Sequence, residues 1–284
     1  MAGTILVTGA TGNVGAAVLA LLRGHEPCVV AAVRDVARAR GRLGDGIAYV
    51  PFDFERPDTH AAAFSGIERL FLVRPPELAD VRGVIAPAIR AARAAGVRHV
   101  VFLSILGAER NRVVPHHRIE QTLRESGMDW TFLRASYFMQ NLDTTHRAEV
   151  RRGELLIPAG RGATSFVDVR DVAAVGALAL TTGGHANRAY NLTGARALTY
   201  AEVARQFTAV LGRPVRYADP SPLAYVRALR AAGQPWPFIG VTLGIYTVAR
   251  LGLAARIADD LPRLLGRAPI TLRQYIEDYR DAWA

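Results

Sequence analysis

Residues 4–15 read Thr-Ile-Leu-Val-Thr-Gly-Ala-Thr-Gly-Asn-Val-Gly, an apolar strand that runs directly into a glycine turn. Gly9, Gly12 and Gly15 follow the spacing Gly-x-x-Gly-x-x-Gly, and a helical pattern continues to Arg23. Glycine is needed where a turn adopts unusual backbone angles and where the chain must approach a pyrophosphate closely. The free N–H groups at the helix N-terminus favour the same anion. The stretch therefore predicts a dinucleotide-binding unit; the alternative is a merely tight strand–helix turn.

The remainder of the first half alternates short apolar runs with helical patterns, which indicates a parallel sheet covered on both faces. The expected strands are residues 4–8, 28–33, 47–50, 69–73, 97–103 and 130–133, and the expected helices are 14–23, 59–65, 81–95 and 116–126. Together they predict an α/β doubly wound parallel-sheet Rossmann fold over residues 1–152, completed by segments from 153–192. Its ligand is expected outside the carboxyl ends of the strands.

The second half, residues 153–284, is less regular and predicts a smaller, mostly helical C-terminal substrate-binding part. Short strands are expected at 155–158, 165–168, 189–192 and 215–217, and helices at 169–180 and 199–211. Thr199 and Glu202 fit a capping box at the start of the last helix. The chain beyond Pro220 reads as helical, and we expect it to pack over the strand ends and shape an apolar pocket.

Composition narrows the possible partners. All 35 residues of the Lys+Arg count are arginine, and the net charge is +10. Because the arginines are scattered and no basic tail occurs, we do not expect nucleic-acid binding. The single cysteine, Cys28, excludes an intrachain disulfide and favours the cytoplasm. The apolar stretch from Phe238 to Ala249 is too short to span a bilayer, and no metal-ligand spacing is present.

The end of the second predicted strand bears on the choice of dinucleotide. Arginine at this place accommodates the 2′-phosphate of NADP, whereas an acidic residue binds the ribose hydroxyls of NAD. Arg34 comes first and Asp35 second, so we expect NADP(H) to be preferred, with NAD(H) possible; Asp35 instead caps the next helix. Asp53, with Phe54, follows the third strand and is expected at the adenine, its alternative being an ordinary turn aspartate.

Eight segments in order resemble the NmrA-like, atypical short-chain dehydrogenase/reductase family. They are residues 7–15, 33–35, 69–76, 104–108, 119–127, 129–134, 138–141 and 166–171, and the similarity runs to about Tyr217. The resemblance implies a pyrophosphate site at Gly9, Thr11, Gly12, Asn13, Val14 and Gly15, and a 2′-phosphate site at Arg34. It also implies that Val73, Arg74, Pro75 and Ser104 lie along the nicotinamide. Arg74 is unusual there; it could attract an anionic substrate or make a ribose or surface contact.

Two features depart from the pattern of the resembled family. His116 stands where many relatives have a lysine, and Ala135-Ser136 replaces a proline and a glycine. Histidine titrates near neutrality, so His116 could bind the nicotinamide ribose or donate a proton to the reduced substrate. The alternative is a structural pairing with Glu120 one helical turn away.

Four further residues are candidates for the substrate side. Tyr137 could donate its hydroxyl to a substrate carbonyl or pack in the pocket; we expect Asn141 one helical turn further on the same face, as an amide contact. Phe138 and Trp236 would supply aromatic surface, although aromatic residues are often core.

The absence of lysine excludes the Tyr-x-x-x-Lys pair of short-chain dehydrogenases. Flat conjugated electrophiles such as quinones, enones and imines need little acid assistance, because their developing charge is delocalised. The sequence therefore predicts an NADPH-dependent oxidoreductase that transfers a hydride to a hydrophobic or aromatic small molecule, working as a monomer or homodimer. The alternatives are an NADP(H)-sensing regulatory protein without turnover and a non-redox tailoring enzyme.

Overall fold

The computed structural model describes residues 3–24 and 28–283, which fall into two compact units. The first unit comprises residues up to 135 together with 169–192, and the second comprises 136–168 and the residues from 193 onward. Residues 136–152 thus group with the second unit by their contacts. Each unit is described by itself below.

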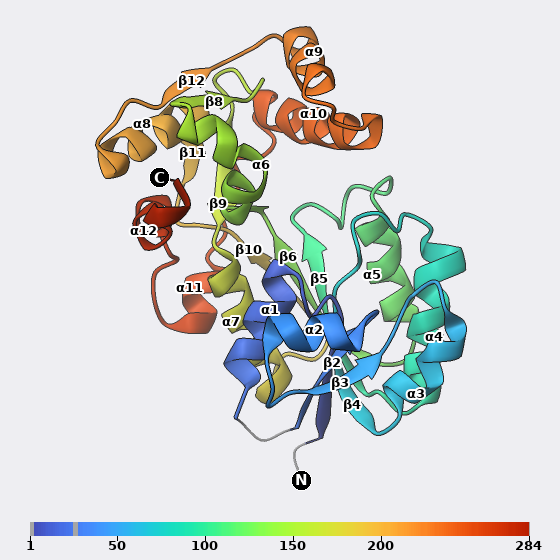
Figure 1. Ribbon diagram of the computed structural model, residues 1–284. Helices are drawn as coiled ribbons and strands as arrows, with labels where there is room; N and C mark the ends of the chain where they lie inside the picture. The colour runs from blue at the N-terminus through green and yellow to red at the C-terminus, as the bar shows by residue number, and fades with distance from the viewer. Residues whose placement is uncertain (1–2, 25–27, 284) are drawn as a thin grey trace. The chain divides into compact units, whose positions relative to one another are not determined.

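A seven-stranded parallel sheet forms the centre of the first unit (Figure 1). Its strands are β1 (Thr4–Val7), β2 (Val29–Val33), β3 (Ala48–Pro51), β4 (Ile67–Leu72), β5 (His99–Ile105), β6 (Asp129–Ala135) and β10 (Arg188–Leu192). They lie in the order β10-β6-β5-β4-β1-β2-β3, so the order reverses between β1 and β4. The predicted doubly wound α/β fold is confirmed, and the last strand of its sheet comes from 188–192.

Helices cover both faces of this sheet because its strands are apolar on both sides. The helices and helical turns are α1 (Asn13–Leu22), α2 (Val36–Leu43), η1 (Pro57–Thr59), α3 (His60–Phe64), η2 (Val81–Ile85), α4 (Ala86–Ala94), α5 (Pro115–Glu125) and α7 (Val169–Thr181). The α1 and α7 helices pack together on one face, and α3, α4 and α5 lie on the other (Figure 1).

The second unit is mostly helical, as predicted, and carries two small sheets. Strands β7 (Tyr137–Phe138), β9 (Ala163–Val167) and β11 (Ala197–Thr199) form one sheet, and β8 (Glu154–Leu156) pairs with β12 (Arg216–Ala218) in the other. The helices are α6 (Gln140–Arg151), α8 (Tyr200–Leu211), α9 (Pro222–Ala231), α10 (Trp236–Arg250), α11 (Asp260–Leu265), α12 (Leu272–Asp278) and the turn η3 (Arg280–Trp283). No helix in the described ranges is both long and apolar enough to cross a membrane.

Local sequence signals account for several boundaries in the second unit. The predicted capping box is present: Thr199 accepts the backbone N–H of Glu202, and the Glu202 carboxylate accepts the backbone N–H of Thr199. The expectation that Tyr137 and Asn141 share a helical face was wrong, because Tyr137 and Phe138 form a strand beside β9. The helix α6 begins only at Gln140.

A glycine in α7 sets how closely this helix packs in the first unit. A Cβ at Gly176 would lie 2.9 Å from a ring carbon of Phe71 on β4 and 3.4 Å from a methyl group of Val18 on α1. Both neighbours are fully buried, so neither can move without disturbing the core.

We predict that Gly176→Ala lowers the free energy of unfolding by about 1 kcal/mol, because an overpacking cost of about 1–3 kcal/mol exceeds the roughly 1 kcal/mol gain in helix propensity. The matched control is Gly240→Ala in α10, where an added Cβ meets nothing within 4 Å. That control should gain stability. Urea denaturation followed by circular dichroism measures both, and equal effects of the two substitutions would contradict the packing account.

Candidate functional site

The glycine turn after β1 leaves no room for side chains. Gly9 has φ +60°, and a Cβ there would lie 2.8 Å from the Cβ of Val73 at the end of β4. A Cβ at Gly15 would overlap the carbonyl oxygen of Gly9, and the Gly12 N–H donates to that same oxygen at 2.9 Å. The first turn of α1 is thereby packed directly against the end of β1, as a close approach of backbone to ligand requires.

The N-terminus of α1 is open to an anion. Its N-cap is Gly12, no side chain accepts from the first-turn N–H groups, and that turn holds no acidic residue. Gly12 and Asn13 are exposed. By contrast, α2 has an aspartate cap. A helix with free terminal N–H groups and no internal acceptor fits a phosphate group, so the predicted residues Gly9, Thr11, Gly12, Asn13, Val14 and Gly15 form a suitable pyrophosphate cradle.

Thr8 ties the glycine turn to the neighbouring strand end and was missed by the sequence analysis. Its hydroxyl oxygen accepts the N–H of Val73 at 2.8 Å, and the hydroxyl lies 3.2 Å from the Val73 carbonyl oxygen. The residue is fully buried. Because β1 and β4 flank the point where the strand order reverses, this contact fixes the two chain segments between which a dinucleotide binds in such sheets.

Arg34 and Asp35 follow the end of β2. Asp35 accepts the backbone N–H of Arg38 at 3.0 Å and caps α2, which confirms the capping alternative for this residue. Arg34 is exposed and makes no hydrogen bond or ion pair within the part of the chain that the structure describes. An unpaired guanidinium beside the glycine turn suits a phosphate monoester better than a ribose diol.

The segment after β3 contains a turn aspartate and a core aromatic residue. Asp53 accepts the N–H of Glu55 at 3.0 Å, the geometry of an ordinary Asx turn. Phe54 is 5% exposed and packs edge-on against Phe52 at 4.8 Å. The Phe54 side chain therefore belongs to the core, and only its backbone is available to a cofactor.

Arg74 organises the loop that follows β4. Its Nη1 donates to the carbonyl oxygens of Pro75, Pro76 and Leu78 at 2.7, 2.9 and 2.8 Å. Burial lowers the pKa of Arg74, and Glu77 opposes that shift. The guanidinium thus holds the shape of the Pro75 loop, a role that the sequence analysis did not consider.

His116 lies in the first turn of α5, where its ring stacks on Phe102 with centroids 6.0 Å apart. Burial, and secondarily the charge of Arg74, lower the pKa of His116 to about 4. The expectation that it titrates near neutrality was therefore wrong, and at pH 7 the imidazole is neutral. Its Nδ1 is buried without a hydrogen-bond partner among the described residues, so the expected structural pairing with Glu120 is absent.

Glu120 is instead the centre of a buried ionic cluster. It accepts the hydroxyl of Ser104 at 2.7 Å and two guanidinium N–H groups of Arg134 at 3.0 and 2.7 Å. Arg134 also lies 3.3 Å from Glu109. Although burial acts to lower the pKa of Arg134, its hydrogen bonds to Glu120 and the two carboxylate charges raise it. The Ser104 hydroxyl proton, expected along the nicotinamide, is thus engaged by Glu120.

The sequence analysis did not predict this ionic cluster, although the position of Glu120 on α5 indicated it. Ile119 and Leu123 mark the apolar face of α5, and Glu120 sits beside Ile119 with no exposed surface. A fully buried carboxylate on an apolar face requires a cation close by. Arg134, at the end of β6, provides it.

The substrate-side candidates lie in the second unit. The Tyr137 hydroxyl lies 3.2 Å from the Tyr246 hydroxyl. Burial raises the pKa of Tyr137 to about 12, and the side chains of Tyr246 and Asn141 oppose that shift. Phe138 is partly exposed. Trp236 begins α10, is 62% exposed and carries the guanidinium of Arg230 at 4.8 Å over its ring. Tyr137 lies in β7 and Asn141 in α6, so the two residues do not share a helical face as expected.

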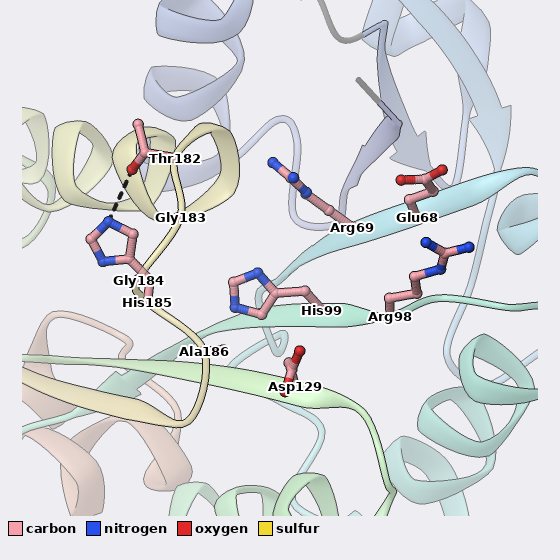
Figure 2. Close-up of a pocket in the computed structure, with 10 residues that line it drawn as sticks. All are labelled: Glu68, Arg69, Arg98, His99, Asp129, Thr182, Gly183, Gly184, His185 and Ala186. Carbon is pink, nitrogen blue, oxygen red and sulfur yellow. Dashed lines mark hydrogen bonds between the residues drawn. The ribbon is translucent and has the colours of Figure 1, made fainter. Parts of the chain in front are cut away.

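Figure 2 shows a polar pocket in the first unit, lined by residues at the amino ends of β4, β5 and β6. The glycine turn follows the carboxyl end of β1, at the other end of the parallel strands. The volume of the pocket is about 240 Å³, and its lining residues are Glu68, Arg69, Arg98, His99, Asp129, Thr182, Gly183, Gly184, His185 and Ala186. Since ligands of such sheets bind at the carboxyl ends of the strands, this pocket is not the dinucleotide site.

Hydrogen bonds fix the tautomer of His99 beside this pocket. The Thr131 hydroxyl donates to the carbonyl oxygen of His185 at 2.6 Å, so it can only accept from His99 Nε2 at 2.8 Å. Burial lowers the pKa of His99 to about 4, against an opposing contribution from Asp129. His99, like His116, is therefore neutral in the folded protein at pH 7.

We predict that the free energy of unfolding falls as the pH drops from 6.5 towards 4. Both histidines have a lower pKa in the folded state than in the unfolded state. As the pH falls, the unfolded state therefore binds protons before the folded state does and becomes more stable relative to it. The loss should be on the order of 1–2 kcal/mol per histidine at pH 5. Denaturation of His99→Asn and His116→Asn at pH 7 and pH 5 measures it; a pH dependence equal to that of the unsubstituted protein would refute the prediction.

Comparison with known proteins places the chain in a family. A model described as the NmrA-like family matches residues 1–245. The NAD(P)H azoreductase of Xenophilus azovorans is 36% identical over 98% of this chain and 99% of its own length. Triphenylmethane reductase of Citrobacter sp., solved with NADP(H), has a TM-score of 0.87 at 29% identity, covering 97% and 99% of the two chains.

The NADPH-dependent quinone oxidoreductase QOR2 of Escherichia coli, solved with NADPH, has a TM-score of 0.89 at 27% identity. That match covers 97% of this chain and 99% of the oxidoreductase. These likenesses extend over both units of the chain. The glycine cradle, the reversal of strand order beside it and these matches lead to one conclusion: the protein belongs to the NmrA-like family.

Proposed function

We propose that the protein is an NADPH-dependent oxidoreductase that reduces flat conjugated small molecules of the quinone, azo or cationic-dye type. The observation that carries the proposal is the glycine cradle at the open N-terminus of α1, in a chain whose relatives are named as NAD(P)H-dependent azo, quinone and dye reductases. Enones and imines, expected from the sequence, share the same delocalised acceptor chemistry.

Different residues of the protein bind different parts of the dinucleotide. The N–H groups of the first turn of α1 bind the pyrophosphate, and the free guanidinium of Arg34 pairs with the 2′-phosphate. Asp53 and the backbone of Phe54 lie towards the adenine. Val73, with the Pro75 loop braced by Arg74, borders the nicotinamide, and Ser104 supports this edge through its bond to Glu120.

Two residues are assigned to the reaction itself. When bound, NADPH supplies the hydride, and the protein supplies orientation and a proton. His116 is neutral, and its buried Nδ1 has no hydrogen-bond partner among the described residues. It therefore acts as a hydrogen-bonding group towards the nicotinamide ribose or the substrate, not as an imidazolium acid. Tyr137 is the proton donor, because its hydroxyl keeps its proton at neutral pH.

The position of Tyr137 in the chain supports this assignment. It comes two residues after the end of β6 in the sequence. Ligands of such folds bind at the carboxyl ends of the strands. Asn141, whose side chain acts to lower the pKa of Tyr137, is assigned to contact the substrate.

The second unit supplies the apolar surface for the substrate. Along α10, Val241, Ile245 and Val248 follow the i, i+4, i+7 spacing of one helical face and are 63, 39 and 45% exposed. Trp236 and Phe138 add aromatic surface. An exposed apolar stripe suits a flat hydrophobic ligand. The substrate-binding role of this unit, the monomeric or homodimeric state and the cytoplasmic location remain predictions.

The first test is oxidation of NADPH, followed by its absorbance, with quinones and azo dyes as acceptors and NADH in parallel. We predict turnover with NADPH preferred. Arg34→Ala should raise the KM for NADPH about 10- to 100-fold and leave that for NADH unchanged, as expected for losing a charge-assisted hydrogen bond of about 1.5–3 kcal/mol. Arg42→Ala, another exposed arginine of the first unit, is the control.

Two outcomes would count against the proposal. If the protein binds NADPH tightly, judged by thermal stabilisation, but oxidises it with no acceptor, the sensing alternative gains and the reductase assignment fails. If Arg34→Ala weakens NADPH and NADH equally, Arg34 does not bind the 2′-phosphate.

We also predict that Trp236→Ala raises the KM for an aromatic acceptor about 2- to 10-fold, because stacking on an aromatic ring contributes about 0.5–1.5 kcal/mol. The KM for NADPH should stay constant. Leu223→Ala, which removes another exposed apolar side chain from the same unit, is the matched control. Identical acceptor KM values for the two variants would exclude Trp236 from the substrate site.

A further inference from the structure

Four side chains of the second unit form a continuous chain of hydrogen bonds. The hydroxyl of Tyr137 lies 3.2 Å from that of Tyr246, and the Tyr246 hydroxyl lies 2.5 Å from Nε2 of His146. Nδ1 of His146 is 2.9 Å from a carboxylate oxygen of Glu149. The four residues come from β7, α10 and α6, so this hydrogen-bonded chain joins segments that are more than a hundred residues apart in the sequence.

The burial of the four residues changes along the series of hydrogen bonds. Tyr246 and His146 are each 1% exposed, whereas the Glu149 side chain is 15% exposed and Tyr137 is partly exposed. The hydrogen-bonded chain therefore has a buried middle and two partly exposed end residues. A purely structural polar network has no need of this arrangement, but a path for protons requires it.

The bonding partners determine which way the protons point. An ionised carboxylate only accepts, so Glu149 accepts from His146 Nδ1 and also from the backbone N–H of Leu156 at 2.9 Å. With one proton on His146, Nε2 accepts from Tyr246, and Tyr246 accepts from Tyr137. With a second proton, Nε2 donates to Tyr246, Tyr246 donates to Tyr137, and the Tyr137 proton is free to point out of the chain.

We propose that Tyr137, Tyr246, His146 and Glu149 form a proton relay that delivers the proton consumed in each reduction. This inference rests on the proposed function for its electron source. The two electrons and one hydrogen arrive on the substrate as hydride from NADPH. The Tyr137 O–H bond breaks as a new bond forms between its proton and the substrate oxygen or nitrogen.

The remaining protons shift one place along the chain. Tyr137 takes the proton of Tyr246, Tyr246 takes the Nε2 proton of His146, and the His146–Glu149 pair regains one proton from water before the next turnover. Tyr137 is the catalytic residue because it touches the substrate. Tyr246, His146 and Glu149 act through it.

The surroundings of Tyr137 explain why a relay is needed. Burial raises the pKa of Tyr137 to about 12, and the side chains of Tyr246 and Asn141 oppose that shift. A phenolate left against the rings of Phe166 and Tyr246 would be costly. Passing a proton from the His146–Glu149 pair removes that charge, so the donor is restored without an anion in the apolar cluster.

The first test needs neither cofactor nor turnover. In protein labelled with ¹³C at the tyrosine ring and ¹⁵N at histidine, NMR follows the protonation of His146 and the hydroxyl-bearing carbon of Tyr137. The relay predicts that the Tyr137 resonance shifts as His146 takes up its second proton, because the bonds between them reverse. Tyr246→Phe should abolish this coupled shift.

The charged and titratable groups near His146 define the control. Glu149 lies on its own helix, and Tyr246 faces it from α10. Tyr137, Tyr200 and Tyr225 pack in turn against Tyr246. Tyr200→Phe removes a buried hydroxyl next to the relay but outside the hydrogen-bonded chain, since its partner is Thr164 at 3.4 Å. This control must keep the coupled shift. The relay is overturned if the Tyr137 resonance does not change when His146 is protonated, or if the coupled shift persists in Tyr246→Phe.

The second test uses the reductase assay. Tyr246→Phe and Glu149→Gln should lower kcat about 10²-fold, the lower end of what a positioned proton donor contributes, with little change in KM. Their solvent deuterium isotope effect on kcat should exceed that of the unsubstituted protein, as proton supply becomes rate-limiting; a merely structural loss would leave it unchanged. Tyr200→Phe should keep both kcat and the isotope effect.

The two tests separate the relay from the function on which it rests. Turnover by the unsubstituted protein with unaltered kcat in Tyr246→Phe and Glu149→Gln would overturn the relay and leave the reductase standing. No turnover together with the coupled shift in NMR would overturn the reductase and support the proton path to Tyr137.

Discussion

The candidate cofactor site depends on the close approach of the first turn of α1 to the end of β1. No Cβ fits at Gly15 against the Gly9 carbonyl oxygen, and Val73 occupies the space beside Gly9. Thr8 bonds the same strand end to β4. These contacts hold the N–H groups of α1 at the point where the strand order reverses, and the helix is left without a capping side chain. The fold thus maintains an anion site that its own side chains do not fill.

Much of this first unit could be predicted because the signals are local. Apolar strand runs, three glycines at fixed spacing and a helical pattern specify a strand–turn–helix unit, and their repetition specifies a parallel sheet. The cap of α2 at Asp35 could also be predicted, since aspartate is a favoured helix cap. The capping box at Thr199 followed from four consecutive residues.

The sequence could not predict which side chains meet when they are far apart along the chain. The protonation of His116 depends on burial against Phe102 and on Arg74, which is 42 positions earlier in the numbering. Glu120 meets Arg134 only because α5 packs on β6. In the second unit Tyr137 was identified as a candidate donor, but its partner Tyr246 lies in a tail that matched no motif. The physical role of a titratable side chain is set by such neighbours, and spacing along the chain does not reveal them.

The central claim is that the protein transfers hydride from NADPH to a conjugated acceptor. It is tested most directly by a single turnover of NADPH carrying deuterium at the transferable position, with a cationic dye or enone that is reduced at carbon. The account predicts that the product gains one deuterium, detected by mass spectrometry, and that the nicotinamide is oxidised in equal amount. Bound NADPH that stays reduced, or a product without deuterium, would contradict it.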